Sequence, residues 1–397
     1  MRTRILAWAL ATALCTITPS GYAADRLATI VADYEALAAQ TDPSRAAGWP
    51  DVSPETAALR AASFTTLRTR LAALAPPPEG SDDALTKDIL RWRLDTLVEG
   101  ARFDEDRVPF DNGDGFFNTA NYVAANLVPR DEVEARKWIE RMSRLPGYYA
   151  AETANMRRGI ATGFMQPRSI AEGILSVLRI AADQPAEASA LLAPLHRLPA
   201  TVPVERREAL LGDALRVITE SVKPAQREMV HFFATEYVPH ARTAPGIRSV
   251  PDGEAYYQYL VRRSTTLPLT PDQVYAMGET EVARLRAEME LAMRATGFSG
   301  TLAEFIAMLR REPRFYAPDL ATYIEKASEI GKRADAALPR WFGRLPRLTW
   351  GIHRQPPELE ASSSGYDPGD PDSGVAGHIN VSSRSPHDPL FALPAWV

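Results

Sequence analysis

Cysteine is almost absent from this sequence. Of 397 residues only Cys15 carries a thiol, and it lies within an apolar stretch near the N-terminus. If that stretch is removed, the remaining chain can form no disulfide and no cysteine-ligated metal site. The stability of the folded protein must then come from its hydrophobic core.

Histidines are few, and their spacing fits no zinc motif. The six are His196, His231, His240, His353, His378 and His387. In the H-E-x-x-H motif, two histidines four residues apart on a helix face one ion, and the glutamate activates water. No two histidines here are four apart. The sequence therefore predicts no metal site built from this chain alone.

Other catalytic and binding motifs are missing as well. There is no G-x-S-x-G nucleophile elbow and no glycine-rich phosphate loop. The serines of residues 362–374 precede no helix and have no positioned histidine, so they predict a loop rather than a nucleophile. The formal net charge of −5 argues against nucleic acid as a partner. We therefore predict no catalytic residue in this chain.

The N-terminus has the features of a secretory signal peptide. Arg2 and Arg4 precede a mostly apolar, uncharged run over residues 5–17, and small residues follow at Gly21 and Ala23. We expect residues 1–23 to be a signal peptide that is cleaved after Ala23. The mature chain would then be periplasmic or secreted.

Neither kind of membrane anchor fits this segment. The apolar run is shorter than the ~20 residues that span a bilayer, so no stable membrane anchor is expected after cleavage. A lipoprotein signal has leucine three residues before its cysteine, and Thr12 stands in that place here.

Most of the remaining sequence has the apolar spacing of helices. The clearest example is residues 270–296, where Thr270 would be the N-cap, Pro271 the first helical residue and Gln273 the partner in a capping box. Strand patterns are confined to residues 347–352 and 376–381. We predict a mainly α fold with a small β element near the C-terminus, formed by one helical domain over residues 24–397.

Residues 104–130 interrupt the helical pattern. Their stretch DNGDG superficially resembles a calcium loop, but Asp111, Asn112, Asp114 and Asn118 do not follow the EF-hand register. The segment is better interpreted as an ordered loop.

Several stretches together resemble one bacterial family, the "domain of unknown function 885" proteins. In chain order they are PFDNGDGFFN (109–118), LPGYYAAETANMRRGIATGFMQPRS (145–169), PDGEAYYQYLVRRSTTLPLTPDQVYAMGETEVARLRAEME (251–290), GFSGTLAEFIAMLRREPRFYA (297–317) and ALPRWFGRLPRLTWGI (337–352). The resemblance covers most of the mature chain, and the block at 251–317 is highly specific. It implies a helical protein likened to zinc peptidases.

The resemblance also implies that part of the family's domain lies beyond this chain. In that family, the stretch like GHINVSSRSPHDPLFALPAWV (377–397) leads into a helix with the motif H-E-x-x-P-G-H-H. That helix supplies two zinc ligands and the glutamate base, and a later helix supplies a third ligand. Since this sequence ends at Val397, we expect a truncated chain with no cofactor, and zinc in a full-length homologue.

A substrate site is implied by the same comparison. In helical zinc peptidases, the strand before the metal helix runs beside the peptide and pairs with its backbone. Residues 376–381 would be that edge strand. His378 and Asn380 would share one face, because side chains alternate along a strand, and Tyr366 would reach the same cleft. An exposed imidazole with no such role fits the position of His378 equally well.

Two functions remain open at the level of sequence. One is the N-terminal, substrate-cleft portion of an exported zinc-metallopeptidase-like protein, inactive by itself, with a peptide or small molecule as substrate. The other is a non-catalytic periplasmic helical binding protein whose natural end is Val397. Coding sequence for H-E-x-x-P-G-H-H beyond codon 397 would favour the first.

Overall fold

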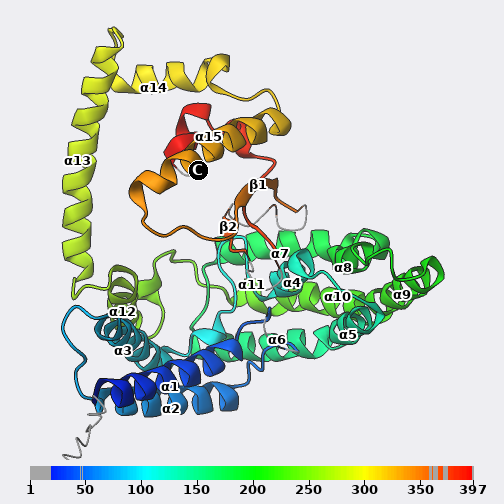
Figure 1. Ribbon diagram of the computed structural model, residues 1–397. Coiled ribbons are helices and arrows are strands. Elements are labelled where there is room, and N and C mark those ends of the chain that lie inside the picture. The colour runs from blue at the N-terminus through cyan, green and yellow to red at the C-terminus, as the bar shows by residue number, and fades with distance from the viewer. Residues whose placement is uncertain are drawn as a thin grey trace, which may run out of the picture. The chain divides into compact units, whose positions relative to one another are not determined.

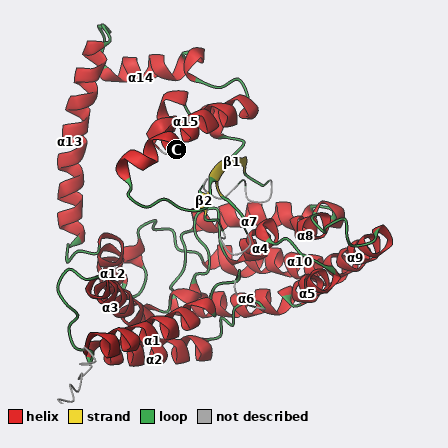
Figure 2. Ribbon diagram, in the orientation of Figure 1, coloured by secondary structure: helices red, strands yellow, loops and turns green. Residues whose placement is uncertain are grey.

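The computed structural model describes residues 19–44, 46, 48–356, 360, 365–369 and 374–395 (Figure 1). It is mainly helical, with one small sheet near the C-terminus, which confirms the predicted fold class (Figure 2). The apolar run of the predicted signal peptide lies outside the described residues. No helix among the described residues is both long and apolar enough to cross a bilayer.

The chain divides into two compact units, and the first contains three helices. Unit 1 comprises residues 1–46 and 50–105, and unit 2 comprises residues 47–49 and 106–397. The helices of unit 1 are α1 (Pro19–Ala39), α2 (Pro54–Ala72) and α3 (Asp82–Gly100). Their shared core consists of Leu27, Ile30, Phe64, Leu67, Leu71, Leu90 and Leu94.

Serine caps fix where two of these helices begin. The hydroxyl of Ser53 accepts a hydrogen bond from the backbone N–H of Thr56, and Ser81 does the same for Ala84. Each bond satisfies one N–H that the first helical turn leaves without a partner.

Unit 2 begins with a body of packed helices. They are α4 (Thr119–Asn126), α5 (Glu132–Ser143), α6 (Leu145–Thr162), α7 (Arg168–Asp183), α8 (Ala193–His196), α9 (Val204–Val217), α10 (Lys223–Phe232) and α11 (Val238–His240). Two π-helical turns, Ile218–Val222 and Phe233–Tyr237, flank α10. Side chains in the core of this body include Trp138, Met156, Ile174, Phe233 and Tyr237, each at most 2% exposed.

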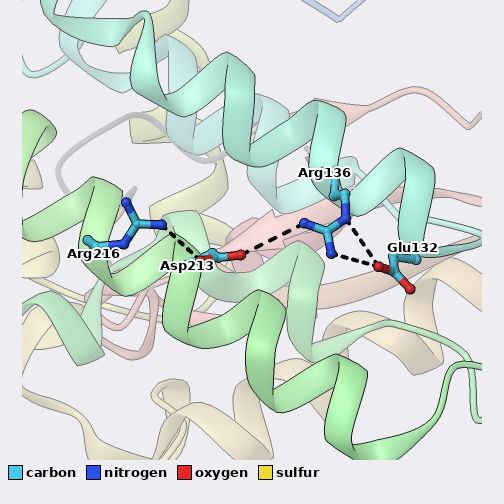
Figure 3. A network of polar contacts seen from close by, with 4 residues as sticks. All are labelled: Glu132, Arg136, Asp213 and Arg216. Atoms are coloured by element: carbon cyan, nitrogen blue, oxygen red, sulfur yellow. Dashed lines mark hydrogen bonds and ion pairs between the residues drawn. The ribbon is translucent and has the colours of Figure 1, made fainter.

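A chain of ion pairs joins α5 to α9 at the surface (Figure 3). Arg136 lies 2.7 Å from Glu132 on its own helix and 3.8 Å from Asp213 of α9. Asp213 in turn pairs with Arg216 at 2.9 Å. Because these charges are partly exposed, each pair contributes at most about 1 kcal/mol. The association of α5 with α9 therefore depends mainly on their buried apolar side chains.

The segment 104–130, predicted as a loop, is only partly irregular. It contains the short helix α4, which the polar and glycine-rich sequence before it obscured. Asp114 organises the turn before α4, because its carboxylate accepts hydrogen bonds from Asn118 at 2.9 Å and from the hydroxyl of Tyr122 at 2.6 Å.

Four helices of unit 2 follow this body. They are α12 (Gly253–Thr265), α13 (Pro271–Ala295), α14 (Leu302–Arg311) and α15 (Leu320–Trp341). The capping box predicted at the start of α13 is confirmed, since Thr270 and Gln273 exchange bonds of 2.8 and 3.2 Å. The apolar positions of α13 are nevertheless exposed, and Met293 is the buried residue of this helix. Tyr275 is 70% exposed and Val282 is 66% exposed.

A three-stranded sheet follows α15. Its strands are β1 (Trp350–Arg354), β2 (Tyr366–Asp367) and β3 (Gly377–Val381), in the order β1-β3-β2. β1 pairs in parallel with β3, and β2 pairs with β3 antiparallel. The expectation that residues 376–381 form an edge strand is therefore wrong. The sequence did not indicate β2, whose two residues lie inside a Gly-, Asp- and Ser-rich segment, so β3 becomes the central strand.

The apolar face of this sheet packs on α15. Val381 is fully buried with Tyr323 and Ala327 of that helix, and Ile352 packs against the same cluster. Trp350 lies so close to Gly331 that a Cβ atom there would come within 2.8 Å of the indole. Its Nε1 also donates to Asp335 at 2.7 Å. These contacts fix the orientation of the sheet relative to α15.

Candidate functional site

The face of the sheet opposite α15 carries a cluster of polar side chains. Register pairs His353 with Asn380 and Asp367 with His378. Residues paired directly across two strands point to the same face. Four polar side chains from three strands therefore gather on one side of the sheet.

The contacts within this cluster centre on one carboxylate. The Nε2 of His378 lies 3.3 Å from Oδ2 of Asp367, and the Nδ2 of Asn380 donates to the same oxygen at 2.6 Å. His378 is stacked on His353, with ring centroids 4.5 Å apart and planes inclined by 21°. Asp367 and the second imidazole thus hold the ring of His378 in one orientation.

Burial sets the charge of the second histidine. Desolvation lowers the pKa of His353, and the neighbouring imidazole of His378 lowers it further. His353 is therefore neutral over a wider pH range than an exposed histidine. A neutral His353 ring can stack on the neighbouring imidazole without carrying a charge into this part-buried position.

Two of the three predicted site residues meet here. His378 and Asn380 share the polar face as the alternation of side chains predicts, and Asn380 is 8% exposed. Tyr366 pairs with Ile379 and so lies on the other face. Its hydroxyl lies over Gly377, where a Cβ atom would come within 2.3 Å of it. The structure does not bring Tyr366 together with the other two.

Tyr366 instead lines a cavity at the apolar face. This cavity, of about 480 Å³, is also lined by Leu338 and Phe342 from the end of α15 and by Trp350 and Ile379 from the sheet. The phenol is 59% exposed. An apolar group could occupy this space, so a role for Tyr366 in binding stays a prediction.

Sequence reasoning missed His353 and Asp367. His353 lies one residue past the predicted strand 347–352, and its link to His378 depends on a parallel pairing across more than twenty residues. Asp367 lies in the segment interpreted as a loop. The signal that was available is the shared alternation of residues 350–354 and 377–381, which would place His353 beside a polar face once the two strands were paired.

The residues described do not fit a zinc ion. Among them, no group of three or more His, Cys, Asp and Glu side chains is arranged to hold a metal. In the polar cluster, the Nε2 of His378 is directed at a carboxylate that also accepts from Asn380. A structural or catalytic zinc needs three or four protein ligands, and the polar cluster does not present such a set.

A separate buried carboxyl group lies in the helical body. Glu152 of α6 is 4% exposed. Burial raises the pKa of Glu152 to about 7, and the charge of Asp106 acts in the same direction. Hydrogen bonds with Tyr148 and Asn155 lower the pKa but do not offset the burial. This carboxyl group can therefore gain or lose a proton near neutral pH.

Solved structures that share this fold include two bacterial proteins. The chain superposes on a Colwellia psychrerythraea protein, described provisionally as a lipoprotein, with a TM-score of 0.80 and 19% identity, covering 96% of this chain and 70% of that one. A Shewanella oneidensis protein of unknown function, described in the same way, gives a TM-score of 0.55 and 14% identity, covering 91% of this chain and 64% of the other. At these identities the likeness shows the fold alone.

Comparison with curated protein sequences finds no match to the chain. Comparison with family profiles does find one. The profile of a family described as "Bacterial protein of unknown function (DUF885)" matches residues 35–397.

Proposed function

The chain belongs to the DUF885 family of bacterial proteins, and from this premise we propose that it is the substrate-binding, non-catalytic portion of an exported metallopeptidase-like protein. The proposal assigns substrate positioning to these residues and bond cleavage to residues outside them. The observation that carries it is the polar face of the sheet, where Asp367 orients His378.

This face has the features of a binding surface. Because Nε2 of His378 is directed at Asp367, the opposite ring nitrogen is the one that can bond a ligand. Asn380 and Asp367 fix each other by a bond of 2.6 Å. A ring held in place by its neighbours loses little conformational entropy when it binds, which favours affinity.

A peptide is the class of ligand that the sheet favours. In the described part of the sheet β1 is an edge strand, and an edge presents unpaired backbone N–H and C=O groups. An extended peptide can add to such an edge by main-chain hydrogen bonds. His353 projects from β1 itself, so a peptide paired with β1 would pass beside the stacked imidazoles.

The chain matches 70% and 64% of the lengths of the two solved structures compared with it. Export is supported by the predicted signal peptide and by the description of both relatives as lipoproteins.

Binding of a labelled peptide tests the proposal. The probe is a fluorescein-labelled hexapeptide pool of alanine with two randomised central positions, and fluorescence anisotropy is measured against the mature chain. We expect saturable binding that His378→Ala weakens about tenfold, the usual effect of losing a hydrogen bond to a charged or oriented partner. His196→Ala, at an exposed position on α8, is the control and should bind like the wild type. Equal binding by all three proteins, or none by the wild type, would contradict the proposal.

A further inference from the structure

A cavity lies inside the helical body of unit 2. Its volume is about 340 Å³, within the range of small-molecule sites. Its apolar wall comes from separate elements and includes Phe117, Tyr149, Leu178, Leu191 and Met229. The proposed peptide site on the sheet makes no use of this space.

Two of the stretches that carry the family resemblance meet at this cavity. Phe117 and Asn118 come from the stretch 109–118, and Tyr149 comes from the stretch 145–169. Asn118 is 3% exposed and Tyr149 is 4% exposed. The fold thus directs the two segments into one wall.

Lys223 gives the cavity a buried positive charge. It is the first residue of α10, directly after a π-helical turn, and it is 7% exposed. Its Nζ donates to the carbonyl oxygen of Ala181 at 2.7 Å, with Ala182 at 3.5 Å. An ammonium group has three N–H donors, so these two carbonyls, one of them distant, leave capacity for a further acceptor.

The surroundings do not fully stabilise this charge. Burial lowers the pKa of Lys223, Arg227 lowers it further, and Asp183 opposes both. Glu360 also lines the cavity, but its carboxylate accepts from the backbone N–H of Ser383 at 2.8 Å and from its hydroxyl at 3.0 Å. An anion bound in the cavity would supply both a hydrogen-bond acceptor and a negative charge to the ammonium group of Lys223.

Gln226 adds an unsatisfied acceptor to the same wall. It lies three residues after Lys223, on the same face of α10, and both side chains line the cavity. The Oε1 of Gln226 is buried and has no hydrogen-bond partner among the described residues. A buried acceptor without a donor is destabilising, and a ligand with an N–H or O–H group would supply the missing donor.

We propose that this cavity binds a small apolar carboxylate that also carries a hydrogen-bond donor, a class that N-acyl amino acids represent. The carboxylate accepts from Lys223, and the donor bonds Oε1 of Gln226. The apolar part packs on Leu178 and Met229.

A matched pair of ligands tests the charge requirement. The probes are N-acetylphenylalanine and its neutral C-terminal amide, titrated calorimetrically into the mature protein. We expect the acid to bind at least about tenfold more tightly than the amide, as for a charge-assisted hydrogen bond. Equal affinity for the two would overturn the proposal.

Lys223→Met should abolish the preference for the acid, and the chain offers a close control. The Nζ of Lys87 donates to two successive carbonyls, those of Leu74 and Ala75, at 2.7 and 3.5 Å, the same distances as at Lys223, but Lys87 lies in unit 1. Lys87→Met removes a similar pair of lysine–carbonyl contacts and should keep the preference. Loss of the preference in both variants would show a structural effect and contradict the proposal.

A second variant keeps the ammonium and fills the space. Ala190 lines the cavity, so Ala190→Trp should weaken binding of the acid by about tenfold or more through steric exclusion. Unchanged binding of the acid would contradict the proposal, because the ligand would then lie outside this cavity. His378→Ala should leave binding of the acid unchanged. Failure of binding in the cavity can therefore be told apart from failure of peptide binding at the sheet.

Discussion

The imidazole of His378 is stacked on that of His353, with ring centroids 4.5 Å apart, and its Nε2 lies 3.3 Å from Oδ2 of Asp367. Three strands separated in sequence contribute one residue each to this contact. The contact ties the geometry of the proposed binding face to the protonation of His353, whose pKa burial and the neighbouring imidazole lower.

His353 should make the protein less stable as pH falls. Since the pKa of His353 is lowered in the folded state, the unfolded chain binds more protons below the ordinary histidine pKa of about 6.5. Stability from this group is therefore present above that pH and is lost as the pH falls through it. His353→Phe keeps a ring that can stack but cannot be protonated. Denaturant midpoints at pH 7.5 and 5.5 should differ less in this variant than in the wild type, whereas His387→Asn should behave as the wild type does.

Glu152 should have the opposite pH dependence. Its pKa in the folded protein is about 7, against 4.5 for an exposed glutamate. The folded state then binds more protons between these values, so stability falls as pH rises from about 5 to 7. Glu152→Gln has no charge to bury and should be more stable than the wild type at pH 8, by roughly 3 kcal/mol, with the difference shrinking toward pH 5.

A matched variant checks the assignment to Glu152. Glu172 lies exposed on α7, and Glu172→Gln should have the same dependence of stability on pH as the wild type. If Glu152→Gln also had the wild-type dependence, the prediction would be wrong, because Glu152 would then ionise in the folded state without loss of stability.

The exposed side of α13 should bind a hydrophobic dye and promote self-association. Tyr275, Val282, Leu285 and Met289 are between 47% and 70% exposed, and their spacing places them on one side of the helix. Apolar area left in water is unfavourable by roughly 25 cal/mol per Å². Val282→Glu combined with Leu285→Glu should lower dye fluorescence and shift the protein toward monomer in light scattering. Ala287→Glu, exposed on the opposite side of α13, should do neither.

The mature chain should not retain zinc. The described residues contain no group of three or more suitable side chains, and tight sites need three or four protein ligands. After dialysis with zinc and then against buffer, far less than one equivalent should remain by elemental analysis. Stoichiometric zinc would contradict both the metal prediction and the division of labour proposed for this chain.

Local patterns predicted the helices well, because their determinants are close in sequence. Thr270 caps the helix expected to begin at Pro271, and Gln273 completes the predicted capping box. The same reasoning placed His378 and Asn380 on one face of a strand. Neither result required knowledge of distant contacts.

The parts that escaped prediction depend on residues far apart in the chain. β2 has two residues and forms only because β3 is beside it, so His353 and Asp367 could not be joined to His378 from local patterns. The central position of β3 has the same origin. The burial of Lys223 could not be predicted from its helical sequence, because a lysine on a helix is usually solvated.

Mass spectrometry of a peptide pool incubated with the mature chain tests the central claim most directly. The chain is captured and the bound peptides are identified, with and without added zinc and with a chelator as control. The account predicts that peptides are enriched on the wild type, are enriched less on His378→Ala, and are recovered uncleaved in every condition. Absence of enrichment, or cleavage products that disappear when the chelator is added, would contradict it.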